Sequence, residues 1–109
     1  MVKLIYCISK KPGMSVEEFQ RYWRDVHGPI AARIPGLRRY VQCHVVPSLY
    51  ERDTKPAYDG AAELWFDDLD ALASAMRSSE VAAALEDEKH FIDHARVASF
   101  VTIEKPVVE

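Results

Sequence analysis

Hydrophobic and polar residues along the chain follow two different periods. Alternation at every second position, or a short apolar run, is typical of a β-strand, whereas apolar residues three and four positions apart form one face of a helix. These patterns predict strands at residues 2–8, 37–46, 58–66 and 97–104. Helical spacing follows capping residues at 15, 67–68 and 78–79, and the last helix is expected to span 80–89. The elements therefore follow the order β-α-β-β-α-β.

The first predicted helix has recognisable signals at both ends. Ser15 and Glu18 have the spacing of a capping box, in which the hydroxyl and the carboxylate each satisfy a free backbone N–H. Gly28 is expected to stop the helix, because glycine tolerates the left-handed conformation. Pro29 would then begin one further turn. The helix is therefore expected to end at His27, with the turn at Gly28 fixing the direction of the imidazole ring.

The order of elements predicts an α+β protein of the ferredoxin-like type, whose four-stranded antiparallel sheet carries both helices on one face. A chain of 109 residues is near the usual size of one domain, so residues 1–109 are expected to form a single unit. With the helices on one side, the other face of the sheet needs a separate cover.

Polar and aromatic side chains are predicted to mark that second face. By the period of two, it would carry five residues of the two middle strands: Tyr40, Gln42, His44, Glu63 and Trp65. A solvated face does not need tyrosine and tryptophan, and a dry core does not favour glutamine, histidine and glutamate. We therefore expect a homodimer whose two sheets close around a partly polar cavity. The alternative is a monomer that binds its ligand through the open sheet face.

Charge and composition narrow the choice of partners. The net charge is −3 without a run of like charges, so no nucleic-acid partner is expected, because phosphates favour a basic stripe. The apolar runs are shorter than a bilayer span and the N-terminus lacks a signal-peptide pattern, so no membrane association is expected. Cys7 and Cys43 lack metal or redox spacing and are interpreted as inert buried thiols. A cytoplasmic protein is the expectation.

His27 is the strongest single candidate for chemistry. At the end of a helix, the negative end of the macrodipole favours a protonated imidazole, which suits a general acid or base. The alternative is a histidine that only stabilises the helix end. Local sequence weighs these two interpretations about equally.

Tyr40 and His44 form a second candidate group. Tyrosine can donate a hydrogen bond to a carbonyl or phenolate oxygen, and histidine can move a proton. Glu63 is expected to orient a neighbouring histidine, and Trp65 offers a flat wall for an aromatic ligand. The alternative is an ordinary half-buried strand face with satisfied polar tips.

No metal centre is expected. His90 and His94 have the i, i+4 spacing of helical metal ligands, and Glu63 or Glu88 could add a third ligand. However, the helix is expected to fray before His94, and no further histidine or cysteine pair supports a site. The chain also lacks a glycine-rich phosphate loop and a GxSxG elbow, which argues against nucleotide binding and serine-hydrolase chemistry.

The chain resembles the EthD family along nearly its whole length. The similar stretches are residues 2–6, 12–15, 22–29, 35–40, 58–66 and 87–93. The most specific are Trp-x-x-x-His-Gly-Pro at 23–29 and Asp-Gly-x-x-Glu-x-Trp-Phe at 59–66. The resemblance implies a dimeric α+β barrel of ferredoxin-like protomers, each with a cavity between its sheet and its helices. Proteins with this barrel include isomerases, polyketide cyclases and dehydratases, and cofactor-independent oxygenases.

The same resemblance implies roles for individual residues. It places His27 and Tyr40 on the cavity, and Glu63 and Trp65 on the pocket strand. Phe91 and Asp93 would lie near the pocket mouth. Cys43 stands where the family pattern leads us to expect asparagine, so no role is assigned to it.

Three functions follow from these expectations. The first is an enzyme without a cofactor, an isomerase, cyclase, dehydratase or oxygenase of a hydrophobic oxygenated or aromatic compound. His27, Tyr40 and His44 would be catalytic, and the substrate would contact Gln42, Glu63, Trp65, Phe91 and Asp93. The second is an accessory ligand-binding protein that serves a P450-type degradation pathway without chemistry of its own. The third is a haem- or metal-dependent oxidoreductase with His27, His44 or His90 as ligand.

Overall fold

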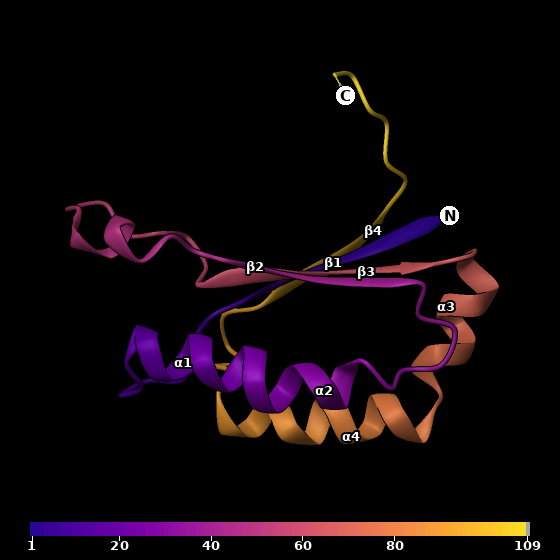
Figure 1. Ribbon diagram of the computed structural model, residues 1–109, viewed down its shortest axis with the longest axis horizontal. Helices are drawn as coiled ribbons and strands as arrows, with labels where there is room; N and C mark the ends of the chain where they lie inside the picture. Colours follow the sequence, from indigo (N-terminus) through magenta and orange to yellow (C-terminus); the bar gives the residue numbers. More distant parts are fainter. Residues whose placement is uncertain (109) are drawn as a thin grey trace.

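The computed structural model describes residues 1–108 and shows a sheet with its helices packed against one face (Figure 1). The strands are β1 (Val2–Ile8), β2 (Arg39–His44), β3 (Gly60–Phe66) and β4 (Ala98–Thr102). The helices are α1 (Val16–Tyr22), α2 (Gly28–Ala31), α3 (Leu69–Met76) and α4 (Ser79–Asp87). Three further helical turns are η1 (Trp23–His27), η2 (Pro47–Glu51) and η3 (Glu88–His90). Glu109, the last residue of the predicted domain, lies outside the described residues.

The sheet has the order β2-β3-β1-β4, and every neighbouring pair is antiparallel. Below it, the run α1–α2 and helix α4 lie side by side, while α3 connects the end of β3 to α4 (Figure 1). The predicted α+β class, the ferredoxin-like order of elements and the antiparallel sheet with helices on one face are confirmed. None of the helices within residues 1–108 combines the length and apolar character needed to span a bilayer.

Side-chain caps start the helices where the sequence places them. The Ser15 hydroxyl accepts a hydrogen bond from the Glu18 N–H at 3.1 Å, as the capping box predicts. The Glu18 carboxylate then accepts from the Ser15 hydroxyl rather than from the Ser15 backbone. Asp68 and Ser78 cap α3 and α4 by accepting backbone N–H groups at 2.8 and 3.1 Å. Local capping chemistry therefore sets these helix starts.

Gly28 does not end the first helix, so that prediction is wrong. Its φ and ψ are both −51°, and the helical path continues through the π-helical turn η1 into α2. Pro29 explains the wide turn: it has no N–H for the carbonyl four residues earlier, and its ring crowds that carbonyl. In the wide turn, the Gly28 N–H binds the carbonyl of Trp23, five residues back. The helix therefore passes His27 without a break.

The core lies between the sheet and the helices. Phe19, Trp23, Phe66 and Phe91 are almost fully buried there, and the rings of Phe19 and Trp23 lie 5.6 Å apart. Gly60 is required where Trp23 crosses the sheet. A Cβ added at Gly60 would lie 2.5 Å from the Trp23 ring, well inside van der Waals contact. The helix and the sheet can therefore approach closely at this point only because Gly60 has no side chain.

Candidate functional site

A cavity of about 280 Å³ lies between the sheet and the helices. Its walls are mostly apolar and come from all four strands, from the run α1–α2 and from α4. The apolar lining includes Leu4, Ile8, Ala31, Ile34, Ala62, Leu64, Val81, Ala84 and Ile92. Five polar or titratable side chains face the same space: Tyr6, His27, Tyr40, Glu88 and Ser99. A mostly apolar space with a few polar groups is typical of small-molecule sites.

Three exposed residues mark one opening of the cavity. Met76 closes α3, Leu85 lies on α4, and Ser99 lies on the edge strand β4. Met76 is 44% and Leu85 53% exposed, although both also line the cavity. The cavity is therefore open to solvent between the helices and the edge of the sheet.

His27 lines the cavity and is 5% exposed. Its Nδ1 lies 2.9 Å from Oδ2 of Asp87 at the end of α4, and its ring packs against Phe91 at 4.8 Å. Tyr22 donates to the other oxygen of Asp87 at 2.7 Å. A carboxylate only accepts hydrogen bonds, so the ring hydrogen resides on Nδ1 and Nε2 keeps its lone pair in the neutral form. Among residues 1–108, no side chain or backbone group binds Nε2.

The position of His27 changes the electrostatic argument made from sequence. The helix continues past this residue into α2, so the ring is not at the end of a helix dipole. The prediction that a helix end favours the protonated imidazole of His27 is therefore wrong. Instead, the Asp87 carboxylate fixes both the tautomer and the orientation of His27. Asp87 lies far along the chain, and its own stretch of sequence gave no signal for this pairing.

Tyr40, Gln42 and His44 form a hydrogen-bonded row on β2. They face the helices, so the prediction that places these three residues on the uncovered face of the sheet is wrong. The Gln42 amide donates to the Tyr40 hydroxyl at 2.8 Å and to the Trp23 carbonyl at 2.9 Å. Its oxygen accepts from Nε2 of His44 at 2.8 Å. His44 also stacks on Trp23, with ring centroids 4.3 Å apart. Because the Tyr40 oxygen accepts from Gln42, the Tyr40 hydrogen is free to be donated elsewhere.

Only Tyr40 of this row reaches the cavity. Gln42 and His44 line a shallow outer groove with Arg24, and Tyr40 lies between the groove and the cavity. Burial raises the pKa of Tyr40, so its hydroxyl stays protonated. Burial, followed by the nearby charge of Arg24, lowers the pKa of His44 and favours the neutral ring. The row therefore offers a neutral hydroxyl to the cavity and a neutral imidazole to the groove.

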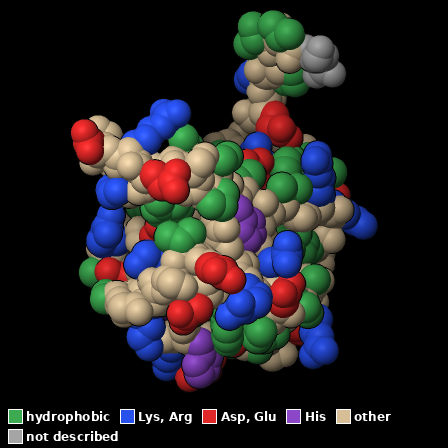
Figure 2. All heavy atoms as spheres, turned by 60° about the vertical axis from the view of Figure 1, so that its left-hand side comes forward, with side chains coloured by type: hydrophobic (Ala, Val, Ile, Leu, Met, Phe, Trp, Pro, Cys, Tyr) green, Lys and Arg blue, Asp and Glu red, His purple; other side chains and the backbone are tan. Residues whose placement is uncertain are grey.

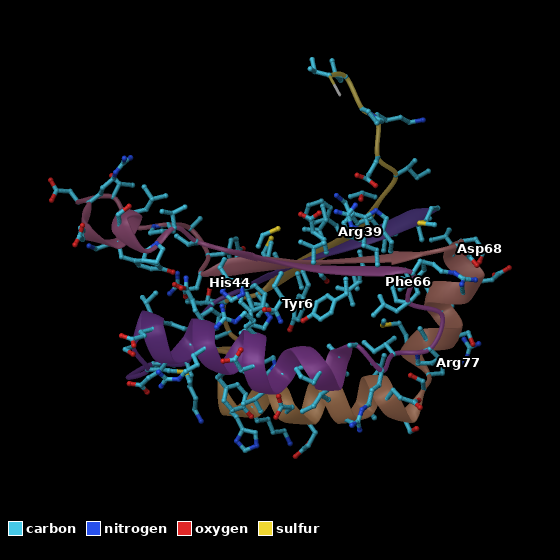
Figure 3. All side chains as sticks on the ribbon, in the orientation of Figure 1. Tyr6, Arg39, His44, Phe66, Asp68 and Arg77 are labelled. Carbon is cyan, nitrogen blue, oxygen red and sulfur yellow. The ribbon has the colours of Figure 1, made fainter. Side chains whose placement is uncertain are left out.

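Glu63 and Trp65 lie on the opposite face of the sheet from the cavity, so the prediction of a shared face with Tyr40 is wrong. Val41 pairs with Glu63 and Arg39 with Trp65 in the antiparallel register, and paired residues point to the same side. Figure 3 shows Tyr6 and His44 projecting towards the helices and Arg39 projecting away from them. The period of two separates the two faces of each strand, but it does not show which face turns towards the helices or how the strands align.

On this open face, Trp65 is part of a charged cluster. Lys3 and Arg39 lie over its ring, 4.9 and 4.6 Å from the centroid, and its indole N–H donates to Glu104 at 2.6 Å. Lys3 also pairs with Glu63 at 2.9 Å. Cation–π contacts and ion pairs therefore explain why Trp65 is 6% exposed outside the cavity.

Phe91 and Asp93 contribute structure next to the cavity. Phe91 is fully buried and packs on His27, but its neighbour Ile92 is the residue that lines the cavity. The Asp93 carboxylate accepts the Ala95 N–H, and its own N–H binds the Ser9 carbonyl at 2.9 Å. These contacts tie the segment after α4 to the end of β1. The structure therefore gives both residues a positioning role around the cavity.

His90 and His94 do not share a helix face, because η3 ends at His90. His90 lies near Tyr22, whereas His94 binds Glu88. Within residues 1–108, no three histidine, cysteine, aspartate or glutamate side chains gather closely enough to hold a metal ion. His27 is the one histidine among the described residues that lines the cavity.

The two cysteines are free, and they lie on the open face of the sheet. Cys7 is half-buried, but Cys43 is exposed, so the prediction of two buried thiols is wrong for Cys43. The Cys43 thiol donates to Glu63 at 3.3 Å. Partial burial and the Glu63 carboxylate raise the pKa of Cys43, which disfavours the reactive thiolate.

Three residues around the cavity were missed as ligand-facing or positioning groups: Tyr6, Asp87 and Glu88. Tyr6 alternates with Leu4 and Ile8 on β1, and this period-two pattern would have placed it on the helix side. The sequence points to Glu88 only as a third metal ligand, yet the residue is 4% exposed and its carboxylate binds Tyr6. No local pattern in the sequence distinguishes Asp87 and Glu88 from the acidic residues that precede them, Glu80 and Glu86.

Charges outside the cavity are mixed. Figure 2 shows positive and negative side chains interspersed over one face of the molecule, with no large area of a single sign. The cavity differs from this surface, because no lysine or arginine is among the described residues that line it. Glu88 is the one carboxylate among the described residues that line it.

A four-stranded ferredoxin-like sheet over a mostly apolar internal cavity defines the class of this α+β protein. The EthD domain matches residues 11–95 of the sequence. The chain belongs to the EthD family. No curated protein matches the sequence.

Solved structures share this fold. An ethyl tert-butyl ether D (EthD) family protein from Bacillus halodurans C-125 is 25% identical with a TM-score of 0.76, covering 96% of this chain and 99% of the other. HapK from Hahella chejuensis is 13% identical with a TM-score of 0.69, covering 100% and 97%. SnoaB from Streptomyces nogalater, a cofactor-independent oxygenase, is 15% identical with a TM-score of 0.64, covering 99% and 97%. The last two likenesses establish the fold alone.

Proposed function

We propose that the protein binds a small, mostly apolar, oxygenated molecule in its cavity and moves a proton on it without a cofactor. The observation that carries this proposal is the position and hydrogen bonding of the His27 ring. The ring is buried on the cavity wall, one nitrogen is held by Asp87, and the other has no partner among the described residues. This arrangement is typical of a positioned general base.

In this proposal, Nε2 of His27 accepts a proton from a carbon or hydroxyl group of the bound molecule. The proton is then returned to a different atom of the same molecule, which gives isomerisation, or to a departing hydroxyl, which gives dehydration. Asp87 stabilises the imidazolium that exists between the two steps. One positioned acid/base group of this kind contributes about 10²- to 10⁴-fold in rate.

Tyr40 would stabilise the negative charge that develops on the substrate oxygen. Its hydroxyl lies on the cavity, and its oxygen already accepts from Gln42, so its hydrogen is directed to another acceptor. The raised pKa of Tyr40 keeps that hydrogen in place at neutral pH. His44 would act on Tyr40 through Gln42 rather than on the substrate, because it lies on the outer groove.

The family and the fold support this proposal at a general level. SnoaB is described as a cofactor-independent oxygenase, which shows that the fold is compatible with chemistry that uses no bound cofactor. Oxidoreductase activity and a role in catabolism are narrower forms of the same proposal. The geometry around His27 favours proton transfer as the reaction type.

The second candidate is an accessory protein that carries the ligand to a partner oxidoreductase. The cavity lining favours this alternative, because an overwhelmingly apolar wall is sufficient to bind and shield a hydrophobic molecule. In that case His27 and Tyr40 would select the ligand without transforming it. The two candidates therefore differ in proton chemistry and not in the location of the site.

We also propose that the protein forms a homodimer through the open face of its sheet. Related structures from Bacteroides fragilis and Thermobifida fusca are described as dimeric with a ferredoxin-like fold. In this chain, Phe100 on that face is 54% exposed, and the apolar residues Ile103, Val107 and Val108 beyond β4 are more exposed still. A second copy would remove this apolar surface from water.

A cytoplasmic location completes the proposal. Cys7 and Cys43 lie on β1 and β2, which flank β3, and both are free thiols. Reduced cysteines of this kind are usual in a reducing compartment.

Deuterium exchange tests the enzymatic proposal. The purified protein is first examined by native mass spectrometry for a molecule that remains bound. That molecule, and a panel of apolar ketones including 2-tetralone, is then incubated with the protein in D₂O, and exchange at carbon is followed by NMR. We expect catalysed exchange or turnover that His27→Ala abolishes while the circular dichroism spectrum stays unchanged.

His90→Ala is the matched control, because His90 is exposed and does not line the cavity. Unchanged exchange in His27→Ala would overturn the assigned role of His27. Ligand binding without any exchange, at an affinity that does not depend on pH, would instead favour the accessory protein.

A further inference from the structure

A buried carboxylate of the cavity takes no part in the proposed proton transfer. Glu88 begins η3, directly after α4, and its side chain is 6% exposed. It lines the cavity among apolar neighbours such as Leu85 and Ile92. Burying a carboxylate in such a place is unfavourable unless hydrogen bonds compensate for the lost water.

Two side chains supply these hydrogen bonds, and both use the same oxygen. The Tyr6 hydroxyl donates to Oε1 of Glu88 at 2.9 Å, and Nε2 of His94 lies 2.9 Å from the same atom. No group within residues 1–108 donates to Oε2. Among the described residues, Ser9 Oγ is the one fully buried side-chain nitrogen or oxygen atom without a hydrogen-bond partner. Oε2 of Glu88 also has no partner, so it is not fully buried. Oε2 therefore remains in contact with open space.

Tyr6 and His94 together hold the Glu88 carboxylate in one orientation. Tyr6 belongs to the central strand β1, whose neighbours are β3 and β4. Burial and the charge of Glu88 raise the pKa of Tyr6, so this phenol remains a donor over the whole physiological range. His94 approaches from the outer side, where its side chain is 48% exposed. The free oxygen is thereby preorganised as an acceptor.

We propose that Oε2 of Glu88 accepts a hydrogen bond from a hydroxyl, phenol or enol group of the molecule bound in the cavity. The cavity would thus select uncharged, largely apolar molecules that carry at least one such donor. This inference rests on the proposed small-molecule function and specifies its ligand class. It assigns Glu88 to ligand recognition and leaves proton transfer to His27.

The charges around the cavity support this selection. Asp87 and Glu88 are adjacent in sequence, and no lysine or arginine lines the cavity within the described residues. A carboxylate or phosphate ligand would therefore meet the Glu88 carboxylate without a lysine or arginine to balance its charge, in a space that also strips away its water. A neutral hydroxyl avoids this penalty and can donate to the free Oε2 of Glu88.

Matched ligands test the proposal on the wild-type protein. Binding of 1-naphthol, 1-methoxynaphthalene and 1-naphthoate is measured by titration calorimetry at pH 7, and 4-ethylphenol is compared with its methyl ether in the same way. We expect each hydroxyl compound to bind at least about tenfold more tightly than its ether, as for a hydrogen bond to a charged acceptor. The naphthoate should bind most weakly.

Glu88→Gln separates the acceptor from the shape of the site. The new amide oxygen is expected to keep the donors Tyr6 and His94, which places an NH₂ donor where Oε2 was. The preference for the hydroxyl should then fall to about threefold or less, or reverse in favour of the ether. Glu86→Gln is the control, because Glu86 is exposed and pairs with Lys89; its preference should equal that of the wild type.

The outcomes are distinguishable. Equal binding of hydroxyl and ether by the wild type, or an unchanged preference in Glu88→Gln, would overturn this inference and leave the small-molecule function intact. If none of the compounds binds the wild type, the proposed function fails together with the inference. The wild-type comparison decides the question even if Glu88→Gln does not fold.

Discussion

The imidazole Nδ1 of His27 lies 2.9 Å from the carboxylate of Asp87, although 60 positions separate the two residues in the chain. This contact joins the end of η1 to the end of α4 on one wall of the cavity. The next residue, Glu88, repeats the arrangement with different partners. Each of the two carboxylates binds one tyrosine and one histidine. The end of α4 therefore organises the polar part of an otherwise apolar space.

Asp87→Asn should weaken the network that holds His27. An amide has one accepting oxygen, so it cannot receive both Tyr22 and His27 in the way the carboxylate does. We expect a loss of about 1–3 kcal/mol in the free energy of unfolding, as for a buried hydrogen-bonded group, measured by urea denaturation. Glu86→Gln on the exposed side of α4 should change it by less than about 0.5 kcal/mol. Equal effects of the two substitutions would contradict the network.

Gly60→Ala should be strongly destabilising, because the new Cβ would meet the Trp23 ring at 2.5 Å and the Cys43 carbonyl at 2.7 Å. We expect a loss of about 1–3 kcal/mol or more in thermal or chemical unfolding, with weaker ligand binding because Trp23 lines the cavity. Gly28→Ala is the control. Gly28 is helical and its nearest contacts would be 3.4 and 3.5 Å, so alanine should be neutral or stabilise by up to about 1 kcal/mol.

His44 should titrate below the ordinary histidine value of about 6.5, because burial and then the charge of Arg24 lower its pKa. The folded protein thus takes up this proton later than the unfolded chain as the pH falls. The stability linked to neutral His44 is complete above the unfolded pKa, and it decreases as the pH falls below that value towards the lower folded pKa. NMR titration of the imidazole measures the midpoint. Arg24→Gln should raise it, and an unchanged midpoint would remove Arg24 as a cause.

The tyrosines should ionise late in the folded protein. Burial, followed by the hydrogen bond to Asp87, raises the pKa of Tyr22 to about 12, and the pKa values of Tyr6, Tyr40 and Tyr50 are also raised. The stability linked to neutral Tyr22 is therefore complete below the unfolded value of about 10 and is lost as the pH rises through about 12. Phenolate absorbance should rise at higher pH in the native protein than in concentrated guanidinium chloride. Coincident titration curves would exclude these burial effects.

Local patterns in the sequence were sufficient for much of the fold. Strand periodicity and helix caps depend on neighbouring residues, so Ser15, Asp68 and Ser78 could be recognised directly. The expectation that His27 and Tyr40 lie on the cavity came from the family resemblance, and both line it in the structure. Their catalytic roles stay predictions.

Features that depend on long-range pairing could not be predicted. In the register between β2 and β3, Glu63 and Trp65 point to the other face of the sheet from Tyr40. Nothing local in the sequence specifies that register. Gly28 stays helical because the wide turn η1 accommodates Pro29. The Gly-Pro sequence is usually a signal that a helix ends, so this continuation could not be predicted. Asp87 and Glu88 acquire their importance only when α4 packs beside the first helix and β1.

Tyr40 touches two separate spaces, the inner cavity and the outer groove. The Tyr40 ring thus separates the cavity from the groove. At this end of the cavity, it limits the length of a molecule that the cavity can hold. A smaller side chain at this position would merge the two spaces into a passage running from the opening at Met76 and Leu85 to the outer side of β2. The size and shape of the space inside this protein would therefore change through one residue, without any rearrangement of the backbone.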